Sequence, residues 1–354
     1  MSIVRVEASR TYDVLINEYG LDQLGKLARR VSGGDVAFVV SDSNVAPLYL
    51  DRAVCSLAEA GYRTASFVFP AGEASKTLST YADCVRSMAE FRLTRSSVVV
   101  ALGGGVVGDL AGFAAATYMR GCRCIQVPTS LLSCVDSSVG GKTAVDLPTG
   151  KNLVGAFFQP DAVLIDTSLL DTLPKHYFID GCAEVLKYGT IADEALFSLL
   201  EKPLETRDTR LEGIIRRCVE IKRDIVQNDE FEKGQRQLLN FGHTLGHAIE
   251  QCSDFSISHG FAVACGMALA ARACAVRGIC PFDSAERLRD VVVSYGFFDV
   301  TEYGAEKLYE AALSDKKRSG DFISTVLMKS IGQAYCEPMG LDDFRSFVSD
   351  ACGA

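Results

Sequence analysis

The sequence predicts an N-terminal α/β domain with a parallel, Rossmann-like sheet, followed by a mainly α-helical domain. Up to about residue 174, short continuous apolar runs such as SVVVAL (residues 97–102) alternate with segments of helical periodicity. This alternation is typical of a parallel sheet that helices cover on both faces. Beyond Pro174 most segments have helical periodicity instead. Because 354 residues are too many for one ordinary core, we predict two domains, 1–175 and 176–354.

The individual elements follow from the same patterns. In the first domain we predict strands at residues 35–41, 63–69, 97–102, 123–127 and 162–165, and helices at 45–60 and 81–91. In the second domain we predict helices at 179–200, 211–228, 236–252, 261–276 and 284–294. Turn signals separate these helices, and no internal repeat or low-complexity segment is visible.

The composition excludes several classes of protein. A formal net charge of −9 argues against a general nucleic-acid binder. The first residues lack the apolar core of a signal peptide, and the longest apolar stretches, 98–119 and 261–271, contain a charge or are too short to cross a bilayer. The 13 cysteines include no CxxC pair, which suits buried thiols in a reducing compartment. We therefore expect a cytoplasmic protein that binds neither nucleic acid nor membrane.

A glycine-rich turn follows the apolar run 97–102 and opens a predicted helix. Gly103, Gly105 and Gly108 satisfy G-x-G-x-x-G, a pattern that lets backbone amides approach a diphosphate. The pattern alone is weak, because a tight strand-to-helix turn without any ligand uses the same glycines. The loop also follows a strand in the middle of the domain, whereas Asp42 ends the first predicted strand. If a dinucleotide binds here, we expect a variant arrangement in which Asp42 holds the ribose.

Three of the four histidines fall within one short region. On a single helix, Arg236, Asn240, His243 and His247 would lie at i, i+4, i+7 and i+11 and form one polar stripe. Two histidines at i,i+4 are more often a hydrogen-bonded pair than metal ligands. The added arginine and asparagine, with His259 just beyond, favour a metal site. A catalytic zinc usually takes three protein ligands and leaves one position open.

Two further segments carry candidate site residues. Glu184 and Lys187 share one helix face within an apolar stretch, where Glu184 would suit a third metal ligand. The alternative is an ordinary surface ion pair. Paired glycines beside Lys142, and GKN at Lys151, suit a loop that wraps a phosphate or a polyol. Lysines in such loops are, however, commonly just solvated.

Together these segments resemble the 3-dehydroquinate synthase family of sugar-phosphate cyclases. The resemblance is carried by GGGVVGDLAGFAAATYMRG, VPTSLLSCVDSSVGGKTAVD, GKNLVGAFFQP, AEVLKYG, LLNFGHTLGHAIE and the late DKK, in this order over nearly the whole chain. It implies a dehydroquinate synthase-like fold, in which the first domain binds NAD and the second binds metal and substrate. It further implies zinc as the metal, with Co2+ as a possible substitute, and a homodimer.

The resemblance also implies a role for individual residues. The implied zinc ligands are Glu184, His247 and His259. The implied catalytic residues of the substrate pocket are Asp136, Lys142, Lys187, Lys222, Arg236, Asn240 and His243. The substrate phosphate would be bound by Asn152, by one of Lys316 and Lys317, and by Arg120 lent from the neighbouring subunit. The implied NAD contacts are Asp42, Asn44, Glu73, Lys76, Gly103, Gly104, Gly105, Gly108, Asp109, Thr129, Ser130, Lys142, Lys151 and Thr172.

The implied reaction is that of a carbon–oxygen lyase acting on a phosphate in the shikimate pathway. The substrate, 3-deoxy-D-arabino-heptulosonate 7-phosphate, carries a carboxylate and a phosphate, so an acidic protein needs a locally cationic pocket. Zinc would polarise a hydroxyl and NAD would oxidise it, which permits loss of phosphate. NADH would then return the hydride, and the opened ring would close into 3-dehydroquinate. NAD is thus regenerated in every turnover.

One position departs from the family pattern, and three alternatives stay open. The family usually continues its last zinc histidine as HGE, whereas this chain has Phe261 and loses a carboxylate near the metal. A sibling cyclase acting on another sugar phosphate would have no substrate carboxylate for Arg236. A metal-dependent polyol dehydrogenase would lack GKN and DKK and would release NADH. A non-catalytic NAD- or metal-sensing protein would have no use for the retained polar residues.

Overall fold

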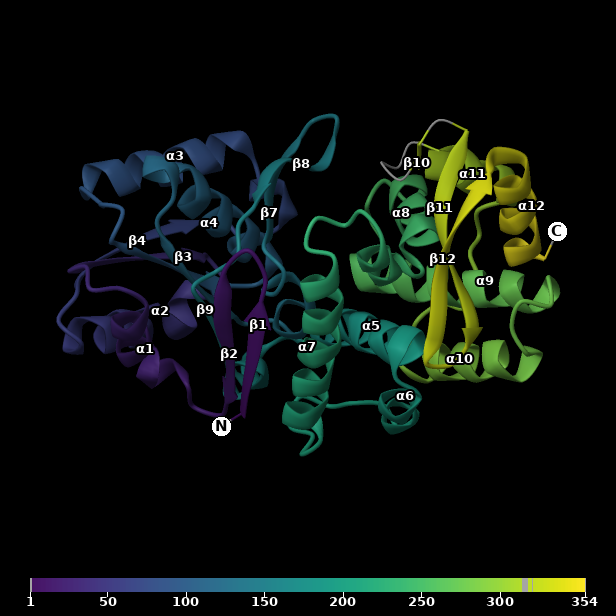
Figure 1. The fold of residues 1–354 in the computed structure, drawn as a ribbon, viewed down its shortest axis with the longest axis horizontal. Coiled ribbons are helices and arrows are strands. Elements are labelled where there is room, and N and C mark those ends of the chain that lie inside the picture. Colours follow the sequence, from purple (N-terminus) through teal and green to yellow (C-terminus); the bar gives the residue numbers. More distant parts are fainter. Residues whose placement is uncertain (1, 314–317, 320, 354) are drawn as a thin grey trace. The chain divides into compact units, whose positions relative to one another are not determined.

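The computed structural model describes residues 2–313, 318–319 and 321–353 (Figure 1). Its contacts divide into two compact units, Met1–Pro174 with Thr209–Glu230, and Lys175–Asp208 with Phe231–Ala354. The second unit thus begins next to the predicted boundary at residue 175. Residues 209–230, which the sequence suggested for the second domain, pack within the first unit instead.

The first unit is built on a sheet of seven strands in the order β1-β2-β9-β6-β5-β3-β4. The strands are β1 Ser2–Glu7, β2 Thr11–Asn17, β3 Val36–Asp42, β4 Arg63–Phe69, β5 Val98–Gly103, β6 Arg123–Pro128 and β9 Ala162–Asp166. Only β1 and β2 pair antiparallel, and all other pairs are parallel. The predicted parallel α/β fold is confirmed, and the five predicted strands lie where the sequence placed them.

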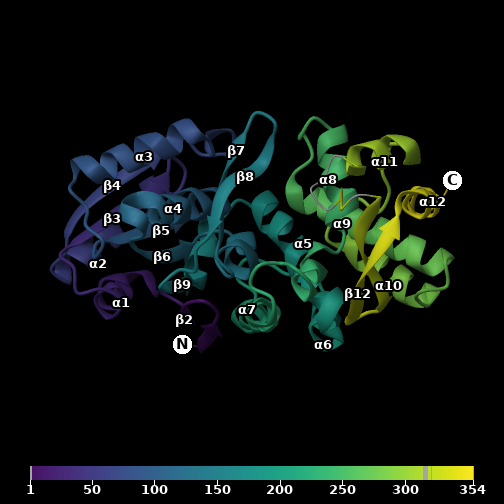
Figure 2. The ribbon, with the colours of Figure 1, turned by 45° about the horizontal axis from the view of Figure 1, so that its top comes forward.

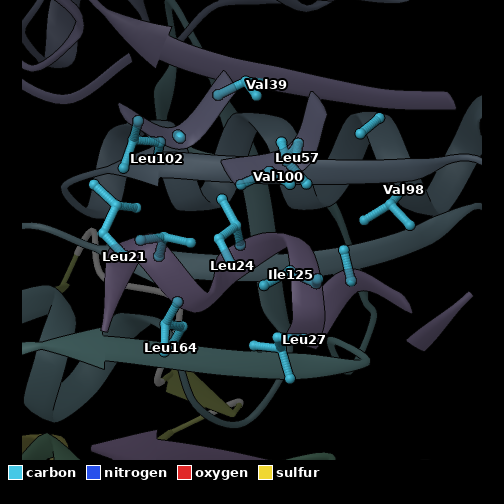
Figure 3. Close-up of a cluster of buried hydrophobic side chains, with 14 of the residues drawn as sticks. Leu21, Leu24, Leu27, Val39, Leu57, Val98, Val100, Leu102, Ile125 and Leu164 are labelled. Atoms are coloured by element: carbon cyan, nitrogen blue, oxygen red, sulfur yellow. The ribbon is translucent and has the colours of Figure 1, made fainter. Parts of the chain in front are cut away.

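Helices cover both faces of this sheet (Figure 2). The helices α1 Leu24–Val31 and α2 Ala46–Glu59 pack on one face, and α3 Leu78–Glu90 and α4 Gly105–Thr117 pack on the other. Successive side chains of β5 point to opposite faces of the sheet and therefore into different cores. Val98, Val100 and Leu102 point into the first core (Figure 3), and the residues between them point into the second.

Further elements complete the first unit. They are the 3-10 helices Leu21–Gln23, Glu73–Ser75, Tyr118–Arg120 and Thr167–Thr172, the π-helix Ser133–Ser137, the antiparallel ribbon β7 Lys142–Leu147 with β8 Gly150–Phe157, and α7 Leu211–Asn228. Helix α7 matches its predicted bounds. Its apolar face, including Ile215 and Val219, is buried, and the helix contacts β1 and the π-helix. This packing is why α7 joins the first unit.

The second unit surrounds one apolar helix, α9 His259–Val276. Its other elements are α5 Lys175–Ala192, α6 Glu194–Leu200, the 3-10 helix Gln235–Asn240, α8 His243–Cys252, α10 Phe282–Ser294, α11 Ala305–Leu313, α12 Leu341–Cys352 and the strands β10 Arg318–Ser319, β11 Phe322–Ser330 and β12 Gln333–Gly340. Within the described residues, only α9 has the length and hydropathy of a membrane span, and 78% of it is buried. It is therefore the core helix of this unit.

Two predicted helices are broken in the structure. The segment 179–200 divides at Asp193, whose side chain accepts a hydrogen bond from the Leu196 amide and so starts α6. The segment 236–252 divides at Gly242, which has a φ of +77°. A Cβ atom on Gly242 would lie 2.4 Å from Met267 Cγ of α9, so close packing also requires glycine here. The single helix that was to align Arg236 with the histidines is therefore wrong.

Candidate functional site

A candidate metal centre lies in the second unit, where three helices bring one carboxylate and two imidazoles together. Glu184 comes from α5, while His243 and His259 are the first residues of α8 and α9. Glu184 Oε1 lies 3.3 Å from His243 Nε2 and 3.4 Å from His259 Nε2. Two ligands of a tetrahedral zinc ion, each bonded at about 2.0–2.1 Å, are roughly 3.3 Å apart. Both distances from Glu184 Oε1 therefore match the spacing of zinc ligands, and the ligand atoms of all three residues lie within 4.8 Å of one another.

The Glu184 carboxylate is buried in a way that suits a metal ligand. The side chain is 1% exposed, and neither oxygen accepts a hydrogen bond from the described part of the chain, although Lys187 forms an ion pair with Oε2. Burial would raise the pKa of Glu184, but Lys187 and His243 outweigh it and hold the pKa well below its ordinary value. A buried, ionised carboxylate is costly unless cations surround it, and a metal ion beside Oε1 would add to the charge that Lys187 supplies beside Oε2.

Each of the two histidines has a partner for its other ring nitrogen. His243 Nδ1 lies 3.1 Å from the Phe241 carbonyl oxygen, and His259 Nδ1 lies 3.4 Å from Glu250 Oε2. Metal-binding histidines usually donate this second N–H to a carbonyl or carboxylate, which turns the Nε2 lone pair toward the metal. Burial lowers the pKa of His243 to about 4, so its ring is neutral and ready to ligate near neutral pH.

The described residues contain two groups of potential metal ligands, and the predicted set has members in both. The ligand atoms of Glu184, His243 and His259 lie within 4.8 Å of one another, whereas His247 forms a second such group with Glu250 and His259. The ring centroids of His243 and His247 are 5.5 Å apart, so both imidazoles belong to one cluster. No group of potential ligands in the described residues joins His247 to Glu184. The ligand set that we propose below accordingly has His243 in place of His247.

Phe261, the departure from HGE, does not leave His259 without a carboxylate neighbour. The Phe261 ring packs against Phe297 and Phe298, with centroid distances of 4.9 Å and 5.8 Å. The carboxylate beside His259 Nδ1 comes from Glu250 of α8, which is buried. Glu250 was not predicted from the sequence, although it lies in the same motif, three residues after His247.

Three predicted substrate residues of the second unit lie on α5 and on the 3-10 helix before α8. Arg236 and Lys187 are each 1% exposed, so both cations are buried. Asn240 Nδ2 donates a hydrogen bond of 2.9 Å to Glu232 Oε1. Glu232 was not singled out from the sequence; it lies in the charged segment 229–233, between two predicted helices. Buried cations suit an anionic substrate.

The first unit brings two predicted catalytic residues together across 86 residues of sequence. Lys222 Nζ donates hydrogen bonds of 2.5 Å to the Asp136 carbonyl oxygen and 2.8 Å to Asp136 Oδ1. Lys222 comes from α7, and Asp136 comes from the π-helix. The Glu230 carboxylate holds the end of α7 by accepting hydrogen bonds from Ser9 and Gln159. The position of Lys222 thus depends on how α7 docks on the sheet.

Several residues predicted to contact a dinucleotide lie at the carboxyl ends of β3 and β5. The chain passes from β3 outward to β4 and then returns past β3 to β5, so strand order reverses between β3 and β5. Ligands of open parallel sheets bind at such a point. Asp42 ends β3, and its Oδ1 accepts hydrogen bonds from the Asn44 and Val45 amides. The glycine loop ends β5 directly beside it.

Close packing requires glycine at some positions of this loop but not at others. A Cβ atom on Gly103 would lie 2.5 Å from Val107 Cγ2, and one on Gly108 would lie 2.9 Å from Gln126 Oε1. A Cβ atom on Gly104 would meet nothing nearer than Ser130 Oγ at 3.5 Å, an ordinary contact. Packing within the protein therefore does not require glycine at residue 104. A diphosphate bound at the open first turn of α4 would require glycine at residue 104.

Lys76 connects several of the other predicted NAD and phosphate contacts. Its Nζ lies 2.6 Å from Asp109 Oδ2, 3.5 Å from Glu73 Oε1 and 2.5 Å from Asn152 Oδ1, and the residue is 4% exposed. Burial raises the pKa of Asp109 to about 6, although the Lys76 ammonium opposes this shift. The cluster joins residues that the resemblance assigned separately to NAD and to the substrate phosphate.

We expect Asp109 to titrate near pH 6 in the metal-free and NAD-free protein. Because this pKa lies above the value of about 3.9 for an unfolded aspartate, the group favours the folded state in acid, and that contribution is lost as pH rises through about 6. Carbon-13 NMR of labelled aspartate carboxyls measures the pKa of Asp109, whose signal is identified by its absence from the spectrum of Asp109→Asn. A titration midpoint near pH 4 for that signal would contradict the expectation.

The remaining predicted residues are placed as follows. The Thr129 amide donates to the Gly103 carbonyl oxygen, the Ser130 amide donates to Ser133 Oγ, and Thr172 Oγ1 lies 2.5 Å from the Tyr49 hydroxyl. Lys142 and Arg120 are exposed, and Lys151 lies half-buried on β8. Lys316 and Lys317 lie outside the described residues.

Comparison with known proteins points to one family. The family model described as 3-dehydroquinate synthase N-terminal matches residues 66–180, and that described as 3-dehydroquinate synthase C-terminal matches residues 181–318. Proteins named 3-dehydroquinate synthase are 42% identical in Clostridium acetobutylicum, over 92% of this chain and 93% of the relative, and 41% identical in Streptococcus pneumoniae, over 95% and 96%.

Solved structures agree in fold. A 2-deoxy-scyllo-inosose synthase, complexed with carbaglucose-6-phosphate, NAD+ and Co2+, is 26% identical with a TM-score of 0.88 and covers 98% of this chain and 99% of its own. The 2-epi-5-epi-valiolone synthase of Streptomyces hygroscopicus subsp. jinggangensis, with NAD+ and Zn2+ bound, is also 26% identical with a TM-score of 0.88, over 99% of both chains. An iron-containing alcohol dehydrogenase, 15% identical with a TM-score of 0.71 over 99% of both chains, shares the fold alone.

Proposed function

The chain belongs to the 3-dehydroquinate synthase family and has that family's activity in the shikimate pathway, and we propose that it works with zinc held by Glu184, His243 and His259 and with NAD. The observation that carries the zinc assignment is the buried Glu184 carboxylate, with two imidazole nitrogens at 3.3 Å and 3.4 Å from one oxygen. Three ligands of this kind leave a fourth position for a substrate hydroxyl.

NAD is proposed to bind at the carboxyl ends of β3 and β5. Asp42 Oδ1 is engaged by two backbone amides, which orients the carboxylate for a ribose hydroxyl. Gly104 leaves the first turn of α4 open to a diphosphate. When bound, zinc would supply a Lewis acid for the hydroxyl to be oxidised, and NAD would accept a hydride and give it back.

The chain's own side chains would bind the anionic groups of the substrate and move its protons. The buried Arg236 guanidinium matches a carboxylate in a two-pronged contact, which a sibling cyclase acting on an uncharged sugar tail would not need. Lys187 holds Glu184 ionised. His247 lies in the histidine cluster without being needed as a ligand, so its imidazole is proposed to carry a proton to or from the substrate.

Other proposed contacts rest on the family resemblance. The substrate contacts of the first unit are Asp136, Lys142, Lys222 and Asn152, and Arg120 would serve the neighbouring subunit of a homodimer. Met119, Arg120 and Gly121 all have positive φ values, an unusual backbone that presents Arg120 to solvent. The cytoplasmic location stays a prediction.

Turnover with a trace of NAD tests the proposed cofactor cycle. With zinc and 3-deoxy-D-arabino-heptulosonate 7-phosphate, we expect phosphate and 3-dehydroquinate in equal amounts, many turnovers per NAD, and no net NADH. Chelator-treated protein should be inactive until zinc or cobalt is restored. NADH that accumulates in step with product would favour a dehydrogenase. Turnover of a sugar phosphate without a carboxylate, in place of the heptulosonate, would favour a sibling cyclase.

A further inference from the structure

The first turn of α9, which begins with His259, is held by a carboxylate from another helix. Asp180 of α5 accepts three hydrogen bonds on Oδ1: from Ser258 Oγ at 2.5 Å, from the Gly260 amide at 2.9 Å and from the Phe261 amide at 3.3 Å. The residue before the helix, Ser258, makes no cap hydrogen bond with its own side chain. Asp180 therefore satisfies helix N–H groups that would otherwise have no acceptor, and its charge favours this end of the helix dipole.

The same face of α5 carries the metal ligand. Asp180 and Glu184 are four residues apart on α5, so their side chains leave the helix on one side, about one turn apart. Asp180 binds the backbone of the first turn of α9, and Glu184 Oε1 lies 3.4 Å from the His259 ring of that turn. Two carboxylates of α5 thus contact the same short segment, Ser258–Phe261.

Gly260 shows how tightly the two helices are joined at this point. A Cβ atom on Gly260 would lie 2.0 Å from the Asp180 carbonyl oxygen, a distance that no side chain can accept. The backbones of α5 and α9 are therefore in direct contact beside the metal centre. His259 lies between Ser258 and Gly260, both of which are bonded to Asp180. Its backbone position relative to Glu184 is accordingly fixed from both sides.

We propose that Asp180 is a positioning residue of the metal centre: it fixes the first turn of α9 on α5 so that His259 stays at ligand distance from Glu184. Asp180 belongs to neither group of potential ligands found in the described residues, so it acts through His259 and not on the metal itself. Helix ends fray when their first amides lack partners. Without Asp180, binding of the metal would have to order this turn. The proposal rests on the zinc assignment made above.

Zinc affinity of the full chain, measured by competition with a chromophoric chelator, tests the proposal. Asp180→Ala should bind zinc roughly 10- to 100-fold more weakly, the usual effect of losing a residue that orients a ligand. Asp180→Asn keeps an acceptor oxygen and should restore most of the affinity. The dissociation constant of NAD should stay unchanged in both variants, because the proposed NAD contacts belong to the other unit.

Asp193→Ala is the matched control. Asp193 also starts a helix of this unit, accepting a hydrogen bond of 2.9 Å from the Leu196 amide, but α6 carries none of the proposed ligands. Asp193→Ala should lower the melting temperature, because it too removes a hydrogen bond at a helix start, and should leave zinc affinity as in the wild type. Equal loss of zinc affinity in both variants would overturn the proposal, because general destabilisation would then explain it.

The outcomes separate this proposal from the proposed function. A wild-type chain that binds no zinc would overturn both. A wild-type chain that binds zinc, with Asp180→Ala binding it equally well, would overturn the positioning role alone. If Asp180→Ala does not fold, Ser258→Ala removes one of the three hydrogen bonds and should weaken zinc binding severalfold. Unchanged affinity in that variant would then be the contrary result.

Discussion

His243→Ala should lose its zinc and its turnover, whereas His247→Ala should keep its zinc and lose only turnover. His243 Nε2 is 3.3 Å from Glu184 Oε1, and His247 groups instead with Glu250 and His259. Removing one of three protein ligands should weaken zinc binding by more than the tenfold to hundredfold that a lost outer partner costs. Metal content after dialysis against a zinc buffer, measured by elemental analysis, distinguishes the two variants.

His176→Ala is the control for this pair. His176 lies near the start of α5, is exposed and has its ring centroid 4.0 Å from that of Tyr177, so its loss should change neither metal content nor turnover. Full zinc occupancy in His243→Ala together with loss in His247→Ala would restore the ligand set that the family resemblance first suggested. It would also mean that the contact between Glu184 and His243 is a simple hydrogen-bonding pair.

Arg236→Lys should lower kcat/KM for the heptulosonate by roughly 30- to 1,000-fold, which corresponds to about 2–4 kcal/mol of transition-state stabilisation. A guanidinium holds a carboxylate with two parallel hydrogen bonds, and an ammonium cannot reproduce that geometry. Arg236 is 1% exposed, so no solvent is present to compensate for the lost contact. Zinc content should not change, because a guanidinium offers no lone pair to a metal ion.

Arg289→Lys provides the comparison for this substitution. Arg289 is an exposed arginine of the same unit, paired with Asp290 at 2.9 Å, and the change should leave steady-state kinetics as in the wild type. Wild-type activity of Arg236→Lys on the heptulosonate would remove Arg236 from the carboxylate site. It would also weaken the distinction from sibling cyclases that rests on this residue.

The parallel sheet could be predicted because its central strands are continuous apolar runs. β3 and β5 are buried on both faces, so their sequences contain few polar interruptions. The strands β1 and β2 were missed, as was the ribbon of β11 and β12 in a domain expected to be helical. These strands carry polar residues such as Arg5 and Lys329, so they are not the continuous apolar runs from which the other strands were predicted.

The choice between the histidines could not be predicted from spacing, because it depends on which imidazole lies beside Glu184 of another helix. A helix that continued from Arg236 would have placed Arg236 and Asn240 on one stripe with the histidines. Gly242 breaks that helix, and it must be glycine because α9 passes at 2.4 Å from the position of its absent Cβ atom. A contact between Gly242 and Met267 is tertiary information that a single-sequence pattern does not contain.

The same limit applies to pairs that are distant in sequence. Lys222 and Asp136 were named together through the family resemblance, and only the structure shows the hydrogen bonds between them. Asp180 was not singled out at all, since its partners at Ser258 and Gly260 lie about 80 residues further along. Residue types at short spacing can suggest a ligand, but they do not reveal what holds that ligand in place.

Anomalous X-ray scattering at the zinc edge, from crystals of the zinc-loaded protein, would locate the metal directly. We expect one peak per chain, at about 2.0–2.2 Å from a Glu184 oxygen, His243 Nε2 and His259 Nε2, with His259 Nδ1 still directed at Glu250 as in the present structure. A peak bonded to His247 or Glu250, with His243 outside the coordination sphere, would contradict the site described for this chain.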